Sequence, residues 1–265
     1  MILSSEQQAQ IGVLLRHCGE IMCADPDPEH AKGEITQKDG AANYVTVYDV
    51  QVQTYLENGL IQIFPAAKFI AEEQENDPVS AARGLCFVID PIDGTTNFIH
   101  HMGASAVSVA LFSDGEPVYG AVYDPYRKEL FFALVGCGAY LNGKKITVSD
   151  RDLPHALVSL GTAPYNRDAL ADAVFDKAKR IFLHCADIRR SGSAALDICY
   201  VACGRTDAFF EEILSPWDFA AGQLIVSEAG GRLTDYAGKK PEFGYKSAVL
   251  CSNGCVHDSL LQLLN

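Results

Sequence analysis

The string Asp90-Pro-Ile-Asp-Gly-Thr-Thr-Asn-Phe98 is the densest group of residues that can do chemistry. It follows an unbroken apolar run, Leu85-Cys-Phe-Val-Ile89, which predicts a buried strand ending at Asp90. A proline and a glycine turn the chain there, so Asp90 and Asp93 can converge on one point. Two such carboxylates repel each other unless a cation or a proton lies between them. Hard cations such as Mg²⁺ prefer these oxygen ligands, so the string predicts a cation site.

The same string offers a place for an anion. Gly94-Thr95 presents backbone N–H groups at the possible start of a short helix, an arrangement that favours phosphate. Cation ligands and an anion cradle would then lie side by side. The alternative interpretation is a purely structural Asp-Gly turn after a strand, which is a common feature of proteins.

Three other acidic positions can join this site. Glu72-Glu73 follows a short apolar segment that predicts a strand; alone, it would be an exposed acidic pair. Asp218 and Asp49 each stand three residues after a helix-capping residue, Ser215 and Thr46. An acid in the first helical turn favours the helix dipole, so a structural role is the alternative for both. Asp207 and Glu211-Glu212 flank a further predicted strand.

Periodicity and turn signals predict the elements that position these residues. Helices are predicted over 4–24, 46–64, 167–184, 191–204, 215–229 and from 254 to the end. Strands are predicted over 68–71, 85–89, 105–112, 117–123, 129–135, 157–160, 206–210 and 247–251. Residues 75–84 are predicted as a loop, Leu141-Asn-Gly143 as a tight turn, and 29–45 has no assignment. The hairpin spacing over 85–135 predicts an antiparallel meander.

The element order predicts an α+β fold of layered sheets and helices. A division is expected near residue 150. The N-terminal α+β half, 1–150, would carry the Asp90 string, and the C-terminal α/β half, 151–265, would carry Trp217-Asp218. The two halves are expected to form one compact catalytic unit.

Composition narrows the class of protein. The chain has 265 residues, 48% hydrophobic and 21% charged, which is typical of a globular protein. No segment is long and apolar enough for a membrane span, and the N-terminus lacks the basic start of a signal peptide. The net charge of −13 and the absence of basic runs argue against a nucleic-acid partner. Nine scattered cysteines without an export signal predict reduced thiols and a cytoplasmic location.

Several other chemistries lack their motifs. No Gly-x-Ser-x-Gly elbow, no P-loop string and no His-x-x-x-His pair are present. The cysteine spacing does not fit a zinc site.

The motifs together resemble the inositol monophosphatase family. The Asp90 string, followed by His100, resembles the first family signature. Trp217-Asp-Phe-Ala-Ala221 with Glu228-Ala-Gly-Gly231 resembles the second. The upstream elements occur in the family's order, and so do Gly136-x-Gly138-x-x-x-Asn142-Gly143 and Arg190-x-Gly192-Ser193-Ala194. The resemblance spans roughly residues 8–262.

This resemblance implies an αβαβα sandwich, a homodimer, and hydrolysis of a phosphate monoester by water activated by two or three Mg²⁺ ions. It also implies inhibition by lithium. By position, the implied metal ligands are Glu72, Asp90, the carbonyl of Ile92, Asp93 and Asp218. The implied catalytic pair is Thr95 with Asp49, which would orient and deprotonate the attacking water. The implied substrate contacts are Gly94, Thr95, Thr162, Gly192, Ser193, Ala194, Glu211 and Asp218.

Within this superfamily, the residues after Asp-Gly-Thr indicate the substrate. Nucleotide and histidinol phosphatases tend to have Lys or Arg there, whereas this chain has Thr96-Asn97-Phe98, as in the inositol type. We therefore expect inositol monophosphate or a similar polyol or sugar phosphate. Fructose 1,6-bisphosphate and 3′-phosphoadenosine 5′-phosphate are the alternatives. The chain departs from the family at Ala71, where the family usually has Gly before the acidic pair. The segment Gly161-Thr-Ala-Pro-Tyr165, which is variable in the family, leaves the identity of the alcohol moiety open.

Three rival interpretations come from other classes. A haloacid dehalogenase phosphatase has a similar motif, but its two aspartates are two residues apart, whereas Asp90 and Asp93 are three apart. A regulatory protein with this fold, binding RNA polymerase or another protein, would not need the complete ligand set. A simple metal-binding module would not need Thr95 with Asp49.

Overall fold

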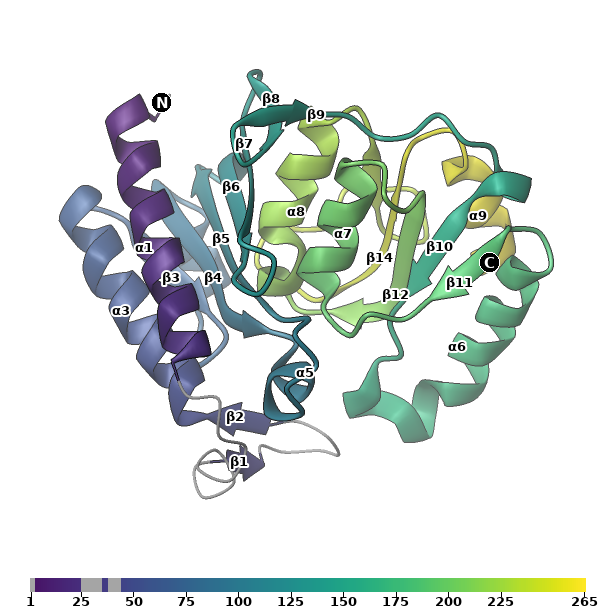
Figure 1. The fold of residues 1–265 in the computed structure, drawn as a ribbon, viewed down its shortest axis with the longest axis horizontal. Helices are drawn as coiled ribbons and strands as arrows, with labels where there is room; N and C mark the ends of the chain where they lie inside the picture. The colour runs from purple at the N-terminus through teal and green to yellow at the C-terminus, as the bar shows by residue number, and fades with distance from the viewer. Residues whose placement is uncertain (1–2, 25–34, 38–43) are drawn as a thin grey trace.

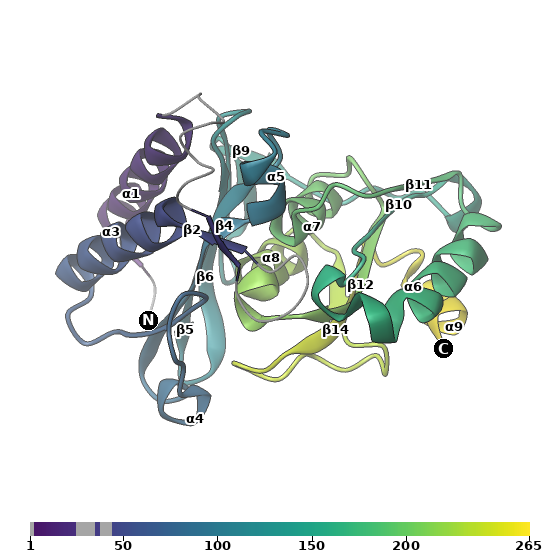
Figure 2. The same ribbon diagram turned by 90° about the horizontal axis from the view of Figure 1, so that it is seen from below.

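Helices and sheets alternate in five layers in the part of the chain that the computed structural model describes, residues 3–24, 35–37 and 44–265 (Figure 1). Helices α1 and α3 form one outer layer, and α6 and α9 form the other. Between them lie a seven-stranded sheet, the helices α7 and α8, and a five-stranded sheet. The same order is visible in the view turned by 90° (Figure 2). The predicted αβαβα architecture is confirmed.

The first layer consists of α1 (Ser5–Cys23) and α3 (Val47–Ile63), which pack against each other. A capping box begins α1: the Ser4 hydroxyl accepts from the Gln7 amide at 3.1 Å, and the Gln7 side chain accepts from the Ser4 amide at 3.0 Å. Buried side chains recur at helical spacing, as at Ile11, Leu15 and Cys18, so one face of α1 covers the sheet.

The seven-stranded sheet has the order β3-β4-β5-β6-β7-β8-β9. Its strands are β3 (Lys68–Ala71), β4 (Leu85–Asp93), β5 (Ala106–Ser113), β6 (Glu116–Asp124), β7 (Glu129–Leu134), β8 (Gly138–Leu141) and β9 (Lys144–Ile146). Strands β3 and β4 are parallel, and every later neighbour is antiparallel, which confirms the predicted meander. A short pair, β1 (Ile35–Gln37) with β2 (Tyr44–Thr46), stands apart from it.

The middle layer comes from the C-terminal half of the chain. Helices α7 (Ala194–Ala202) and α8 (Pro216–Glu228) lie between the two sheets, and α8 contacts β4 to β8 on one side and β13 and β14 on the other. Close approach needs small residues: a Cβ on Gly120 would lie 2.6 Å from the Ala221 carbonyl oxygen. The two halves therefore share one core, and the division near residue 150 stays a prediction.

The five-stranded sheet has the order β11-β10-β12-β14-β13. Its strands are β10 (Leu157–Leu160), β11 (Asp187–Arg189), β12 (Ala208–Leu214), β13 (Arg232–Thr234) and β14 (Ser247–Ser252). The outer helices are α6 (Arg167–Phe182) and α9 (His257–Leu264). Short helical turns complete the chain: α4 (Pro78–Ala81), α5 (Thr95–Ile99), η1 (Leu153–His155) and η2 (Pro164–Asn166).

Asp207 anchors the connection between the two sheets. Its buried carboxylate accepts from the Arg151 Nε at 2.8 Å and from the Leu157 amide at 2.7 Å, and also from the Ser149 hydroxyl. These donors belong to the segment that leads from β9 to β10. The acid before β12 therefore has a structural role.

The structure adds short elements that periodicity did not predict. The turn at Asn142 and Gly143 is confirmed, with φ of 49° and 77°, and it joins the unpredicted hairpin β8–β9. A four-residue helix, α4, lies inside the predicted loop 75–84, and β11 and β13 have three residues each. Segments this short carry little periodic signal. The unassigned connector 29–45 falls largely outside the described residues.

No helix in the described ranges is long and apolar enough to cross a membrane. All nine cysteines, each within those ranges, are unpaired, as expected for reduced thiols. Four of them are buried, and Cys23, Cys137 and Cys255 are exposed.

His257 makes stability depend on pH. Its fully buried ring lies between the Thr234 and Ser252 hydroxyls, at 3.0 and 2.8 Å, which suits a neutral imidazole with one donor and one acceptor. Burial, aided by the charge of Arg232, lowers the pKa of His257 to about 4. In the unfolded chain this imidazole binds a proton near pH 6.5, whereas in the folded protein it does so only near pH 4. We therefore expect His257 to lower the free energy of unfolding by up to about 3 kcal/mol as the pH falls from 6.5 to 4.

Denaturant unfolding of wild type, His257→Gln and the exposed control His100→Gln at pH 7 and pH 4.5 measures this effect. The loss of stability on acidification should be smaller in His257→Gln than in the other two proteins. An equal loss in all three would exclude the buried imidazole as its source.

Candidate active site

Two neighbouring strands deliver the acidic residues to one edge of the seven-stranded sheet. Strand β4 ends at Asp93, and one extra residue between Asp90 and Asp93 interrupts its register with β5. This bulge brings both carboxylates to the same side. Glu72 directly follows the parallel strand β3, and its amide donates to the Ile89 carbonyl at 3.3 Å.

Asp90, Asp93 and Asp218 form a cluster whose ligand atoms all lie within 4.8 Å of one another. Asp90 is 1% exposed, and its Oδ1 is buried without a hydrogen-bond partner. Burial raises the pKa of Asp90 well above its usual value, and the charges of Glu72, Asp93 and Asp218 raise it further. Burial and neighbouring carboxylates likewise raise the pKa of Asp218. A buried oxygen without a donor among like charges is the arrangement that a cation would relieve.

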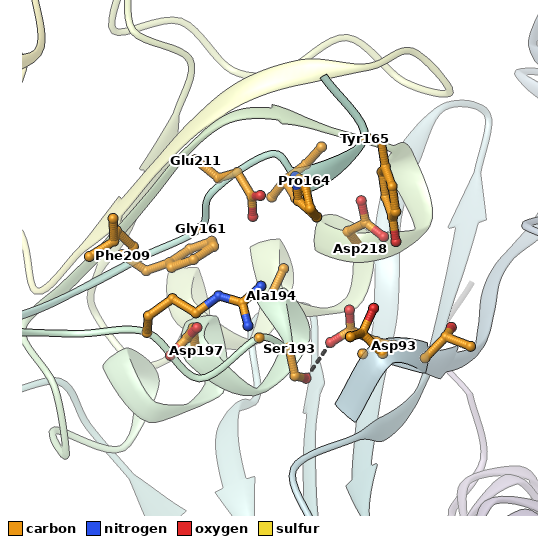
Figure 3. A pocket seen from close by; sticks show the side chains of 17 residues that line it. Asp93, Gly161, Pro164, Tyr165, Ser193, Ala194, Asp197, Phe209, Glu211 and Asp218 are labelled. Atoms are coloured by element: carbon orange, nitrogen blue, oxygen red, sulfur yellow. Dashed lines mark hydrogen bonds between the residues drawn. The ribbon is translucent and has the colours of Figure 1, made fainter. Parts of the chain in front are cut away.

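Hydrogen bonds fix two of the three carboxylates. Asp93 Oδ2 accepts from the Ser193 hydroxyl and from the Ala195 amide at 2.9 Å (Figure 3). Burial raises the pKa of Asp93 to about 6, against the lowering effect of these bonds. Asp218 Oδ2 accepts from the Ser215 amide at 2.7 Å. Asp218 therefore caps α8 and also belongs to the cluster. The structural and the functional interpretations of this residue are thus compatible.

The residues present fit Mg²⁺. The donor set is made of carboxylate oxygens, the ligands that this ion prefers, and Asp90 Oδ1 has no hydrogen-bond partner among the described residues. Glu72 is outside the 4.8 Å group, although its charge is the largest neighbouring influence on Asp90. The Ile92 carbonyl accepts from the Thr95 hydroxyl at 3.1 Å.

Thr95 and Asp49 lie in contact across 46 residues of sequence. The Thr95 hydroxyl is 3.4 Å from Asp49 Oδ1, and both residues are buried. Asp49 Oδ2 accepts from the amide and the hydroxyl of Thr46, at 2.7 and 2.6 Å. Asp49 is therefore a helix cap for α3 whose second oxygen faces Thr95. The pair predicted from the sequence is brought together.

Gly94 begins the short helix α5 beside the cluster. Its φ of 86° favours glycine, and a Cβ there would lie 3.0 Å from the Gly192 carbonyl oxygen. Gly94, Thr95 and Thr96 all line the cavity described below. The first amides of α5 therefore lie where a phosphate next to the cluster would be bound.

A cavity extends from this cluster toward the five-stranded sheet (Figure 3). Its lining residues are Asp93, Gly94, Thr95, Thr96, Leu160, Gly161, Pro164, Tyr165, Arg190, Gly192, Ser193, Ala194, Asp197, Phe209, Glu211, Leu214 and Asp218. Thr162, predicted as a substrate contact, is not among them, so its role stays a prediction. The other predicted substrate contacts all line the cavity.

Glu211 holds the loop that leads from β10 to α6. Its Oε1 accepts from the Ala163 amide at 2.9 Å, and a Cβ on Gly161 would lie 1.9 Å from its Oε2. Burial raises the pKa of Glu211 to about 7, although the Ala163 hydrogen bond lowers it. The prediction that Glu211 flanks the strand over 206–210 is wrong, because Glu211 lies inside β12, next to a register shift.

Sequence reasoning assigned no role to three residues of this cavity, Arg190, Asp197 and Tyr165. Asp197 is 2% exposed and accepts from the Ser191 hydroxyl at 2.6 Å, and burial raises its pKa to about 7. Tyr165 is half exposed, and desolvation of its phenol, followed by the charges of Glu72 and Asp218, raises its pKa. Arg190 stands in the motif Arg190-x-Gly192-Ser193-Ala194, which was the available signal for it.

The second signature also contains a structural clamp. Both oxygens of Glu228 accept backbone amides, from Gly136 and from Gly138, each at 2.7 Å. This acid ties the turn before β8 to the end of α8. Gly136 and Gly138 of the glycine motif thus contact Glu228 of the second signature, and none of the three lines the cavity.

The layered fold, with a carboxylate cluster beside the start of α5, suits a metal-dependent phosphatase. A family model described as the inositol monophosphatase family matches residues 4–265. Inositol monophosphatase 2 of Solanum lycopersicum is 39% identical over 243 residues, 88% of this chain and 90% of that protein. Nus factor SuhB of Escherichia coli K12 is 42% identical over 206 residues, 77% of this chain and 76% of that protein. The chain belongs to the inositol monophosphatase family.

Solved structures agree with this assignment. The extragenic suppressor protein suhB of Bartonella henselae superposes with a TM-score of 0.89 at 32% identity, covering 98% of this chain and 99% of that chain. An IMPase/NADP phosphatase complexed with Mg²⁺ and phosphate has a TM-score of 0.79 at 28% identity, covering 89% and 88%.

Proposed function

We propose that this protein is a Mg²⁺-dependent phosphatase that hydrolyses inositol monophosphate, or a similar polyol or sugar phosphate, by direct attack of water. The observation that carries the proposal is the Asp90–Asp93–Asp218 cluster with its unpartnered buried oxygen, next to the start of α5. The complex of a relative with Mg²⁺ and phosphate supports it.

The chain's own residues would divide the work as follows. Asp90, Asp93 and Asp218, with Glu72 close by, would hold Mg²⁺, which when bound neutralises phosphate charge and makes a water molecule more acidic. The amides of Gly94 and Thr95 would hold the phosphate. Thr95 Oγ1 would orient the attacking water and pass its proton toward Asp49 Oδ1, 3.4 Å away. Two or three ions are proposed, as in the family.

The alcohol end of the cavity supports a hydroxyl-rich substrate. Glu211 lines it with a carboxylate that can accept hydrogen bonds from hydroxyl groups. Thr96 lines the cavity at the position where nucleotide phosphatases tend to have Lys or Arg. Fructose 1,6-bisphosphate and 3′-phosphoadenosine 5′-phosphate are the alternative substrates. The regulatory alternative is not favoured, because the acidic cluster and the Thr95–Asp49 pair are both complete.

A phosphate-release screen tests the proposal. Inositol 1-phosphate, sugar monophosphates, fructose 1,6-bisphosphate and 3′-phosphoadenosine 5′-phosphate are compared with Mg²⁺ and with excess chelator. We expect the highest kcat/KM for a polyol or sugar phosphate and no turnover with chelator. The best activity on the adenosine bisphosphate would refute the substrate proposal. Inhibition by lithium, a homodimer and a cytoplasmic location are further proposals from the family resemblance.

Glu211→Gln should change substrate preference more than turnover. A glutamine keeps an oxygen for the Ala163 amide, so the loop stays in place, but it removes the charge that faces the alcohol. We expect kcat/KM for inositol 1-phosphate to fall about tenfold, with a smaller change for p-nitrophenyl phosphate, whose alcohol has no hydroxyl group to bind. Glu212→Gln, whose carboxylate is paired with Lys177, is the matched control. Equal losses on both substrates would place Glu211 in the catalytic machinery instead.

A further inference from the structure

Arg190 brings a positive charge into the cavity. It lines the cavity together with Asp197 and Glu211. A Cβ on Gly192 would lie 2.6 Å from the Arg190 Nη1, so the guanidinium lies against the bare Cα of that glycine. The Gly192 carbonyl in turn approaches Gly94. Gly192 therefore lies between the Arg190 guanidinium and Gly94, whose amide is proposed to bind the phosphate.

Asp197 and Glu211, two acids that line the cavity together with Arg190, accept hydrogen bonds from other groups. Asp197 Oδ2 accepts from Ser191, and Glu211 Oε1 accepts from the Ala163 amide. Within the described part of the chain, Arg190 forms no hydrogen bond and no ion pair with either acid. Its charge nevertheless acts on both: it lowers the pKa of each against the larger effect of burial.

The neighbouring arginine shows the contrast. Arg189, on β11, is paired with Asp187, is half exposed and does not line the cavity. Arg190 is exposed as well, but it lines the cavity, and within the described residues none of its donors forms a hydrogen bond or an ion pair. A planar guanidinium binds carboxylate or phosphate oxygens in pairs, which a neutral hydroxyl group cannot match.

We propose that Arg190 recognises an anionic group, a carboxylate or a second phosphate, on the alcohol moiety of the substrate. This inference rests on the proposed phosphatase function and narrows its substrate class to phosphate monoesters that carry a second negative charge. Arg190 is then a specificity-determining residue, and the reacting phosphate is held by the cluster and α5.

Two substrate pairs isolate the second charge. Glycerol 2-phosphate and 2-phosphoglycerate differ by one hydroxymethyl group replaced by a carboxylate. Fructose 1-phosphate and fructose 1,6-bisphosphate differ by one phosphate. The wild-type protein with Mg²⁺ should show a kcat/KM about tenfold or more higher for the anionic member of at least one pair. A preference for 2-phosphoglycerate would identify a carboxylate as the recognised anion, and a preference for fructose 1,6-bisphosphate would identify a second phosphate.

Arg190→Gln should lose most of that preference, with the kcat/KM of the anionic member falling about tenfold more than that of its partner. Arg190→Lys, which keeps the charge without the planar fork, should lie between the two. Arg189→Gln is the matched control and should keep the wild-type ratio. Thermal unfolding of each variant checks that the fold is retained.

Two results would overturn the inference. One is a wild-type protein without preference for the anionic member of either pair, including a failure to hydrolyse both anionic members. The other is an Arg190→Gln variant whose activity falls equally on both members, which would mean a contact with the reacting phosphate. A failure of the proposed function is distinguishable, because then neither these four esters nor inositol 1-phosphate would release phosphate.

Discussion

Asp90→Asn should lower kcat with Mg²⁺ by about a thousandfold or more on every substrate that the protein hydrolyses. Phosphoryl transfer depends mainly on positioning and charge neutralisation, so a lost ligand charge is costly. Asp90 is the sharpest test because its Oδ1 has no donor from the chain. Asp93→Asn would also disturb the bonds from Ser193 and Ala195 at the start of α7. Phosphate release under saturating substrate measures the effect.

The same substitution should have the opposite effect on stability without metal. Burial and four neighbouring carboxylates raise the pKa of Asp90, so its charged form opposes folding at neutral pH. An amide removes that charge, and we expect the midpoint of thermal unfolding in chelator to stay equal or rise. Added Mg²⁺ should then stabilise the wild-type protein more than the variant, since binding to the folded state alone stabilises it.

The exposed Asp176→Asn in α6 is the matched control, because it removes one negative charge far from the cluster. It should retain wild-type activity and the wild-type response to Mg²⁺. Undiminished turnover of Asp90→Asn, or wild-type turnover in excess chelator, would contradict the metal site. A drop in stability without metal would show that Asp90 is held by contacts rather than poised for a cation.

The layers of the fold were predictable because their signals are local. An apolar run such as Leu85–Ile89, bounded by turn residues, can be recognised as a strand without its partners. Short strands such as β11 and β13 were not predicted, since three residues carry no periodic pattern and form only against β10 and β14. The position of α7 and α8 between the sheets is a tertiary property, and the family resemblance alone implied it.

The residues of the site also differ in whether local sequence was enough to predict their contacts. Asp90 and Asp93 are close in sequence, so a turn between them was enough to predict that they converge. The contact of Thr95 with Asp49 spans 46 residues, and only the resemblance connected them. Glu211 and Arg190 both line the cavity because β11 and β12, each parallel to β10, run toward the same edge of the sheet. The spacing of residues along the chain does not contain this information, because it depends on how distant segments pack together.

Thr95→Ala should lower kcat by about a hundredfold to ten-thousandfold while leaving the affinity for Mg²⁺ nearly unchanged. The Thr95 hydroxyl lines the cavity and lies within reach of the Ile92 carbonyl and of Asp49, so it is placed to act on a water molecule. Thr95→Ser keeps the hydroxyl and is the control, with kcat expected within about tenfold of wild type. Calorimetric titration with Mg²⁺ measures the affinity for the metal. An unchanged affinity together with a lower kcat would assign the effect to proton transfer from the attacking water.

The stereochemistry at phosphorus then decides between direct attack and a phosphoenzyme. A haloacid dehalogenase type of enzyme would use Asp90 as the nucleophile, which requires that carboxylate to face the substrate. Asp90 is 1% exposed and is not among the residues that line the cavity, whereas Thr95 is. Single-turnover hydrolysis of a chiral phosphate should therefore invert configuration, and borohydride should trap no acyl phosphate. Retention, or label reduced onto Asp90, would refute direct attack, because retention requires a covalent phosphoenzyme and the label would identify Asp90 as its site.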